Sequence, residues 1–139
     1  MSIVSGLSVP GKLAMLTGEF SSSDVYKIAL YGENAHITPL TETYETSGEV
    51  SGQGYEKGGM VLEGYTAGVD GMTACITWAK NPVWKNATIS AQGALIYNAS
   101  KRNKAVVVVE FGKVVTSTNG NWTFPMPQLT SSTAIIRIS

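Results

Sequence analysis

Few residues in this chain are of the types that carry out catalysis. The chain contains one histidine, His36, and one cysteine, Cys75. A single histidine excludes a zinc or iron site built from several histidines, and any Ser-His-acid or Cys-His arrangement would depend on this one residue. Cys75 lies between Ala74 and Ile76, and a thiol among apolar neighbours stays protonated and unreactive. We therefore expect His36 to be an exposed loop residue and Cys75 to pack in the core.

Paired carboxylates are the second source of chemistry. Glu42 with Glu45, or Glu49 with Glu56, could supply the acid and the base of a glycoside hydrolase. That reaction needs a cleft that raises the pKa of one of the two carboxyls. These glutamates lie in Thr-, Ser- and Gly-rich sequence, which is typical of an open loop. We expect them to form a solvated acidic surface.

A glycine-rich stretch resembles a cofactor motif only at its start. The segment GQGYEK (52–57) begins like a dinucleotide-binding fingerprint, but Lys57 stands at the position of the third glycine and no helical pattern follows. These glycines are better explained as turn and bulge positions. We therefore predict no catalytic residue, no metal site and no cofactor, and we do not expect an enzyme.

The charges of the chain balance overall, although one turn is basic. There are ten basic and ten acidic residues, so general attraction to nucleic acid or to an anionic membrane is not expected, and no apolar run approaches the roughly 20 residues of a membrane span. Lys101, Arg102 and Lys104 form a basic turn that could bind nucleic acid, with Tyr97, Trp84 and Trp122 as stacking platforms. Such a turn is equally typical of an exposed hairpin. We predict no nucleic acid and no membrane as partners, and we expect the tryptophans to fill the core or anchor a protein interface.

Charge is distributed unevenly along the chain. From Glu33 to Glu63 there are six acids and one base, a net charge of −5, whereas from Lys80 to Lys104 there are five bases and no acid, a net charge of +5. If the two blocks lie on different faces, two copies could meet head to tail, or one face could meet a complementary partner. Alternatively, the blocks face each other within one sandwich or are simply solvated, since exposed ion pairs contribute only about 0–1 kcal/mol each.

The elements that must position these residues are predicted to be strands. Gly, Ser, Thr and Asn separate short runs rich in β-branched and aromatic residues, which is the pattern of an all-β sandwich or barrel. One short helix is expected near Lys12–Phe20, where Leu13, Leu16 and Phe20 recur at helical spacing. We expect residues 1–24 to form an N-terminal arm or short helix, a possible anchor, and residues 25–139 to form one sandwich domain. The expected strands are Val25–Tyr31, Gly48–Gly54, Met60–Ala67, Met72–Lys80, Ala87–Asn98, Lys104–Phe111, Asn121–Phe124 and Thr133–Ile138.

Four consecutive valines, Val106–Val109, stand out within this pattern. An unbroken apolar run is typical of a central strand, because successive side chains point to opposite faces. One face of this strand would lie in the core, and the other needs a cover, since each exposed valine would cost about 1.5–3 kcal/mol relative to burial. The cover could be the N-terminal segment or a neighbouring subunit. We expect the subunit.

Five segments of the chain resemble, in order, successive blocks of a family of small virion structural proteins of tailed bacteriophages. They share an aliphatic-Leu strand end, a Glu-Val-Ser-Gly-x-Gly-Tyr-x-x-Gly-Gly turn, a Trp-x-x-Ala-Thr-Ile-x-Ala strand leading to Ala-x-Ile-Tyr, and an apolar strand that ends in Phe-Gly. The blocks are VYKIALYG (25–32), TSGEVSGQGYEKGGMVLEG (46–64), WKNATISAQGALIYNAS (84–100), KAVVVVEFG (104–112) and TSTNGNWTFPMP (116–127). The N-terminal 23 residues fit the family pattern poorly.

The resemblance implies a capsid cement or decoration protein with a jelly-roll-like antiparallel β-sandwich of about eight strands. Such a protein binds the outside of the capsid, after assembly in the host cytoplasm, and stabilises the shell by bridging adjacent capsid subunits. Its expected partners are the major capsid protein and further copies of itself, as a dimer or trimer. The alternative is a receptor-binding module of a head or tail fibre that recognises host surface glycans with exposed aromatic residues such as Trp84 or Trp122. The residues expected at the interface are Trp84, Lys101, Arg102, Lys104, Val107, Val109 and Trp122.

Overall fold

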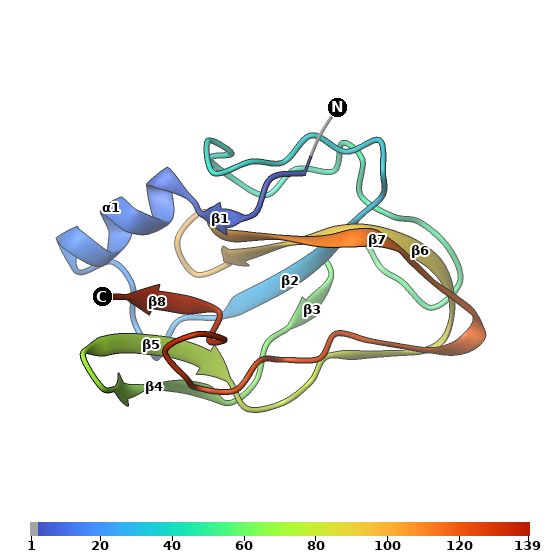
Figure 1. Ribbon diagram of the computed structural model, residues 1–139. Coiled ribbons are helices and arrows are strands. Elements are labelled where there is room, and N and C mark those ends of the chain that lie inside the picture. Colours follow the sequence, from blue (N-terminus) through green and yellow to red (C-terminus); the bar gives the residue numbers. More distant parts are fainter. Residues whose placement is uncertain (1–2) are drawn as a thin grey trace.

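Two antiparallel sheets and one short helix make up the structure, a computed structural model that describes residues 3–139 (Figure 1). The helix is α1 (Val9–Thr17). The first sheet has the strand order β1-β7-β6-β2-β3, with β1 (Gly6–Leu7), β7 (Lys104–Thr123), β6 (Val83–Asn98), β2 (Tyr26–Tyr31) and β3 (Met60–Val61). The second has the order β4-β5-β8, with β4 (Tyr65–Asp70), β5 (Thr73–Trp78) and β8 (Ile136–Ile138). The predicted all-β sandwich with a short N-terminal helix is confirmed, and the jelly-roll arrangement stays a prediction.

Several predicted strands differ from the observed ones for local reasons. The segment Gly48–Gly54 is not a strand: it has positive φ at Gly48, Gly52 and Gly54, and it touches β2 only through a single bridge. The predicted strand Met60–Ala67 is divided into β3 and β4 at Gly64, whose φ of 84° lies in the left-handed region. A residue with a side chain would be strained in that conformation, and the added Cβ would lie 2.7 Å from Ala79 Cβ.

The β6–β7 hairpin is the longest element and joins two of the predicted strands into one. Register shifts interrupt its pairing, and the largest lies where Ala91 pairs with Val115 but Gly93 pairs with Glu110. Extra residues on β7 at this point, including Gly112 with a φ of 78°, form a wide bulge that bends the strand. Figure 1 shows the hairpin turning around one end of the sandwich from the upper layer to the lower. It thereby contributes side chains to both sides of the core.

A bulge also explains how three of the four consecutive valines are buried. Ile96 of β6 pairs with Val107, whereas Tyr97 pairs with Ala105, so Val106 is an extra residue in β7. The bulge places both Val106 and Val107 in the main core between the sheets, while Val108 joins a second apolar cluster on the other face of the first sheet. The alternation of side chains between the two faces of β7 is therefore broken at Val106. Three of the four valines are at most 5% exposed.

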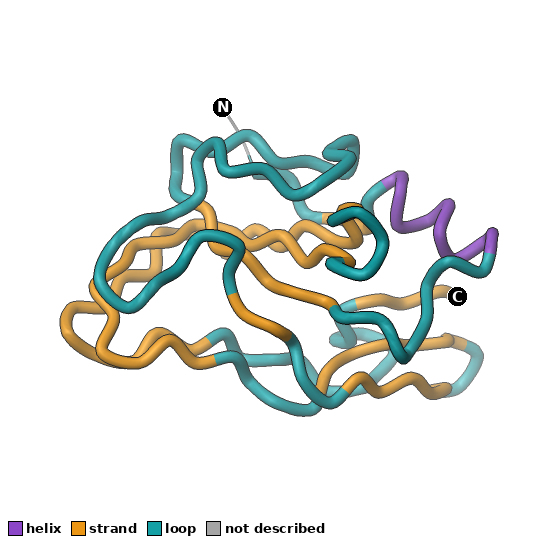
Figure 2. Tube along the Cα trace, turned by 180° about the vertical axis from the view of Figure 1, so that it is seen from behind, coloured by secondary structure: helices purple, strands orange, loops and turns teal. Residues whose placement is uncertain are grey.

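The cover over the second face of the valine strand comes from the same chain. Ala35 and Ile37 in the loop after β2 pack with Ile3 in the cluster that contains Val108. Ile3 also forms a bridge with Ile37 and lies directly over Gly93, where a Cβ atom would approach its Cγ2 to 2.7 Å. In Figures 1 and 2 the loop lies across the outside of the first sheet. The expected cover by a neighbouring subunit is wrong, because an N-terminal residue and a long loop already fill that position. Residues 1–2 of the predicted arm lie outside the described residues.

The covering loop is held in place by a buried carboxylate, Glu49, which is only 7% exposed. Its Oε1 accepts a hydrogen bond from Tyr44 Oη at 2.6 Å, and its Oε2 accepts bonds from Tyr55 Oη at 2.5 Å and from Gly58 N at 2.9 Å. Tyr55 Oη in turn accepts a bond from Leu30 N of β2 at 3.0 Å. The expected solvated acidic surface is therefore wrong for Glu49, which instead joins the middle of the loop at Tyr44 to its end at Tyr55 and Gly58.

The same cluster shifts the acidity of its tyrosines. Burial and the hydrogen bond to Glu49 together raise the pKa of Tyr55 and of Tyr44 well above that of a free tyrosine. Burial, with the nearby Glu49 charge, raises the pKa of Tyr97 to about 12. Tyr97 Oη donates to Gly58 O at 2.6 Å, which fixes the loop from the β6 side. The tyrosines thus remain neutral donors across the ordinary pH range.

The Glu49→Gln variant should lower the free energy of unfolding by about 1.5–3 kcal/mol, the cost of disrupting a buried hydrogen bond to a charged group. The amide keeps only one oxygen, so its NH₂ group must face either Tyr44 Oη or the pair Tyr55 Oη and Gly58 N, all of which donate to the carboxylate. Urea unfolding of the full chain measures the change. The exposed Glu45→Gln is the matched control and should stay within about 0.5 kcal/mol of the parent. Equal stability of the two variants would contradict a structural role for the Glu49 carboxylate.

Candidate interface surfaces

The two tryptophans predicted at an interface lie inside the protein. Trp84 and Trp122 are each 3% exposed and pack edge to face, with ring centroids 5.6 Å apart at 77°. Tyr55 stacks on Trp84 at 6.0 Å, and Trp122 Nε1 donates to Val115 O at 3.0 Å. Their prediction as exposed interface residues is wrong, because both side chains are almost wholly buried, although Trp122 lines one wall of an open hollow beside Phe111. They join the two sheets where the β6–β7 hairpin bends.

The two predicted interface valines have different environments. Val107 is 5% exposed, lies in the main core and pairs with Leu7 of β1, although it also lines a hollow beside β1. Val109, two residues along β7, is half-buried and lines this hollow and a neighbouring one. Val109 is therefore the more accessible of the two valines.

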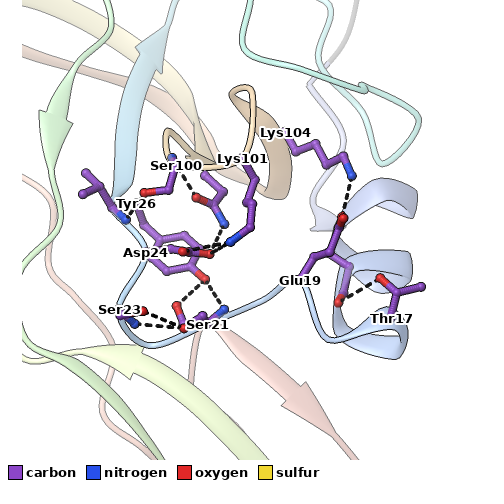
Figure 3. Close-up of polar contacts among 12 residues, drawn as sticks. Thr17, Glu19, Ser21, Ser23, Asp24, Tyr26, Ser100, Lys101 and Lys104 are labelled. Atoms are coloured by element: carbon purple, nitrogen blue, oxygen red, sulfur yellow. Dashed lines mark hydrogen bonds and ion pairs between the residues drawn. The ribbon is translucent and has the colours of Figure 1, made fainter.

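Acidic residues of the N-terminal segment neutralise much of the predicted basic turn. Lys101 Nζ lies 2.8 Å from Asp24 Oδ2, and Lys104 Nζ lies 2.8 Å from Glu19 Oε1 (Figure 3). Arg102, at the tip of the turn with a φ of 56°, is exposed. The turn is therefore not a free cluster of three positive charges. Its lysines fasten the segment between α1 and β2 to the end of the β6–β7 hairpin.

One ion pair joins the two charge blocks. Lys80 Nζ lies 3.1 Å from Glu63 Oε1, and both side chains are mostly exposed. The basic residues Lys101 and Lys104 pair instead with acids outside the acidic block. Within residues 3–139, the two blocks therefore do not form opposed charged faces that neutralise each other along their length.

Of the residues considered for catalysis, His36, Glu42 and Glu45 line one open hollow in the loop after β2, whereas Cys75 lies apart from them in β5. His36 is exposed in the loop after β2, as predicted. Cys75 is buried, as predicted, with its Sγ 3.5 Å from Thr130 O. In the part of the chain that the structure describes, no three His, Cys, Asp or Glu residues gather as they would around a metal ion, and no helix has the length and apolar character needed to cross a membrane.

Helix α1 is capped at both ends and packs on the sandwich through small residues. Ser8 caps its start by accepting a bond from Gly11 N at 2.9 Å, and Gly18 ends it in the left-handed conformation. The helix therefore begins and ends earlier than the predicted Lys12–Phe20. Gly11 and Ala14 are buried against the sandwich, and Gly11 is required there because a Cβ atom would lie 2.7 Å from Val106 O.

The opposite side of α1 is aliphatic rather than polar. Val9, Leu13 and Leu16 are 50%, 56% and 85% exposed, and they follow one another at i, i+4 and i+7 on one side of the helix. The apolar spacing of Leu13 and Leu16 was visible in the sequence, where it would normally indicate the buried side. Here the small residues Gly11 and Ala14 make the buried contact, so the large side chains remain outside. We call Val9, Leu13 and Leu16 the α1 stripe.

A second apolar surface lies along the open side of the sandwich. It consists of two adjoining hollows of about 490 Å³ and 450 Å³ that share Val109, Pro127 and Ile135. We call them together the open-side groove. The first hollow is lined mainly by aromatic and aliphatic side chains of β7 and of the segment before β8. These include Phe111, Val115, Trp122, Phe124 and Pro125.

The groove could not be predicted from the sequence, because its walls come from separate segments of the chain. Phe111 belongs to the bulged part of β7, and Phe124 follows the end of that strand, yet their rings lie 6.1 Å apart. The spacing of Pro125 and Pro127 was the available signal. Proline cannot donate to a strand ladder, so this segment leaves the sheet and its edge stays open.

Comparison of the chain with models of protein families, with curated protein sequences and with solved structures finds no match. The functional interpretation therefore rests on the residues, their geometry and the resemblance of the five sequence blocks.

The Asp24 carboxylate should make stability depend on pH. Burial by itself would raise the pKa of Asp24, but hydrogen bonds from Lys101 and Asn98 outweigh it and hold the pKa below its ordinary value. A carboxyl with a lowered folded-state pKa contributes stability above about pH 4, and that contribution is lost as the pH falls through the folded pKa.

The Asp24→Asn variant should therefore lose about 1–2 kcal/mol of unfolding free energy at pH 7 and less at pH 3. Urea unfolding at pH 3, 4, 5 and 7 measures the difference between variant and parent. The exposed Glu33→Gln serves as the control for general charge effects. A difference between Asp24→Asn and the parent that does not shrink at low pH would contradict the role of the carboxylate.

Proposed function

We propose that this protein is a bacteriophage capsid cement protein that binds the outside of the shell and bridges major capsid subunits. The single observation that carries the proposal is the α1 stripe, three outward aliphatic side chains on a helix anchored to a β-sandwich. The five sequence blocks that resemble small virion structural proteins supply the class of particle. No enzymatic role is proposed.

The α1 stripe is suited to binding because its inner contacts hold it in place. Ser8 Oγ donates to Ala105 O at 2.8 Å, and Ser8 N donates to Val106 O at 2.8 Å, so the start of the helix is tied to β7. Lys104 pairs with Glu19 just beyond its end. A helix held at both ends loses little conformational freedom when a partner covers its outer side.

The energy available from the α1 stripe fits a weak contact that is repeated many times. Burying one large aliphatic side chain contributes about 1.5–3 kcal/mol. A protein that binds the assembled shell but not separate subunits stabilises the shell by mass action. Many copies on a symmetric lattice can therefore protect a particle although each contact is modest. Self-association as a dimer or trimer would place two or three stripes on neighbouring capsid subunits and increase this effect.

The receptor-binding alternative requires exposed tryptophans, and that requirement is not met. It depended on exposed Trp84 or Trp122 to stack against sugars, and both rings are in the core. A polar hollow of about 460 Å³ beside Asn34, Ser51 and Thr88 has no aromatic residue in its lining. We therefore do not propose a fibre module. Labelling of intact virions separates the two roles, since cement is dispersed over the head and a fibre module is confined to the tail or to a few fibre sites.

Leu13→Glu and Leu16→Glu should each weaken particle binding by about tenfold or more, because a charge replaces an aliphatic contact worth about 1.5–3 kcal/mol. Both side chains are exposed, so the fold should persist. Phage particles assembled without the protein are incubated with each purified variant, and bound protein and release of DNA on heating or osmotic shock are measured.

Val61→Glu is the matched control, because Val61 is an exposed aliphatic residue on β3 rather than on α1. It should bind and protect particles as the parent does. Particles that resist heat equally with and without the parent protein would overturn the cement proposal. Full protection by both Leu13→Glu and Leu16→Glu would mean that the α1 stripe is not the surface that binds the particle.

A further inference from the structure

The open-side groove is bordered by free strand edges. β8 pairs with β5 along one edge only, and its other edge has no strand beside it within residues 3–139. On the opposite rim, β1 pairs with β7 only at Val107 and Val108, and β7 continues past it. An uncovered edge presents unpaired N–H and C=O groups that can accept another strand.

The first hollow of the groove is almost entirely apolar, whereas the second also has polar lining residues and carries the one charge of the groove at its β8 rim. Among all the residues that line its two hollows, Arg137 of β8 is the only charged one. Its Nη1 donates to Ser132 O at 2.7 Å, but it has no ion pair in the described part of the chain. The other lining side chains near it are aliphatic or small, including Ile135 and Ala134. A ligand of this groove would therefore be apolar and carry a negative charge.

Strand alternation places the apolar and charged features on different faces. Ile136 is buried in the main core, and Arg137, the next residue, is exposed. In a strand added beside β8, one residue would lie next to Arg137 on its face, and its two neighbours would point to the core side, where the groove opens. The arrangement selects the pattern apolar-acidic-apolar.

We propose that an extended segment of another protein adds to the free edge of β8 as a fourth strand of the second sheet. Its apolar side chains occupy the open-side groove and its carboxylate pairs with Arg137. Backbone hydrogen bonds supply affinity and alternate side chains supply specificity in this mode of recognition. The inference deepens the proposed function, on which it rests, by assigning an extended arm of the shell protein to this groove.

A second copy of the chain is a poorer occupant than a different protein. β8 has three residues with Arg137 at its centre. Antiparallel pairing of two β8 strands about a two-fold axis through that centre would place the two Arg137 side chains opposite each other. Like charges at directly opposed positions destabilise a strand pair. The charge of the rim thus favours a partner segment that is acidic where this chain is basic.

The test uses two synthetic peptides and the full-length chain. One peptide has the core Val-Thr-Val-Glu-Val-Thr-Val with Gly-Ser ends, and the other has Lys in place of Glu. Titration into the ¹⁵N-labelled protein is followed by NMR. We expect the Glu peptide to shift the amide signals of residues 135–138 and 107–111, and the Lys peptide to bind about tenfold more weakly. The Arg137→Glu variant should reverse this preference, and the exposed Arg102→Glu should leave it unchanged.

Equal binding of the two peptides, no binding at millimolar concentration, or shifts confined to other elements would overturn the inference. Concentration-dependent association of the free chain through β8 would also overturn it, since the occupant would then be a second copy. The Leu16→Glu variant should still bind the Glu peptide. If the protein protects particles but does not bind the Glu peptide, the cement role stands and only the strand-addition proposal fails. If it binds the Glu peptide but does not protect particles, strand addition at β8 stands and the cement role fails.

Discussion

A strand that is apolar on both faces must be covered on both faces, and the arrangement of residues 105–109 in β7 follows from that constraint. The bulge at Val106 turns two consecutive valines toward the main core. The remaining face, which carries Val108, is covered by Ile3 and by the loop after β2. Burial of these side chains helps to fix the position of Ile3 and of the long irregular loop after β2.

A loop can act as a cover only if its own polar groups are satisfied. The Glu49 carboxylate provides this by accepting bonds from Tyr44, Tyr55 and one backbone N–H. Tyr55 also accepts a bond from β2, and Tyr44 stacks on Tyr97 of β6. A buried carboxylate is stabilising only when its hydrogen bonds are complete, and no buried side-chain polar atom in the described residues lacks a partner. The covering loop thus presents apolar side chains to the sheet, and its polar groups form hydrogen bonds with one another.

Sequence patterns predicted the class of fold better than the surfaces. The strands β2 and β5 followed from runs of β-branched and aromatic residues, because local propensity and burial agree there. The exposure of the α1 stripe could not be predicted, since it depends on Gly11 and Ala14 fitting close against β7. The burial of Trp84 and Trp122 depends on the bend of the hairpin, which arises from bulges rather than from a propensity. The basic turn looked free because its partners, Asp24 and Glu19, are about 80 residues away.

The two exposed apolar surfaces have a common structural origin in the way β7 is covered. The N-terminal segment crosses β7 with small residues and a two-residue strand, so α1 keeps its large aliphatic side chains outside and β1 leaves most of the β7 edge unpaired. A longer β1 would have closed the open-side groove, and larger residues at positions 11 and 14 would have held α1 away from the sheet. The same short N-terminal segment produces both surfaces. Binding of a partner to the α1 stripe and of a strand to the open-side groove would therefore both depend on how this segment packs against β7.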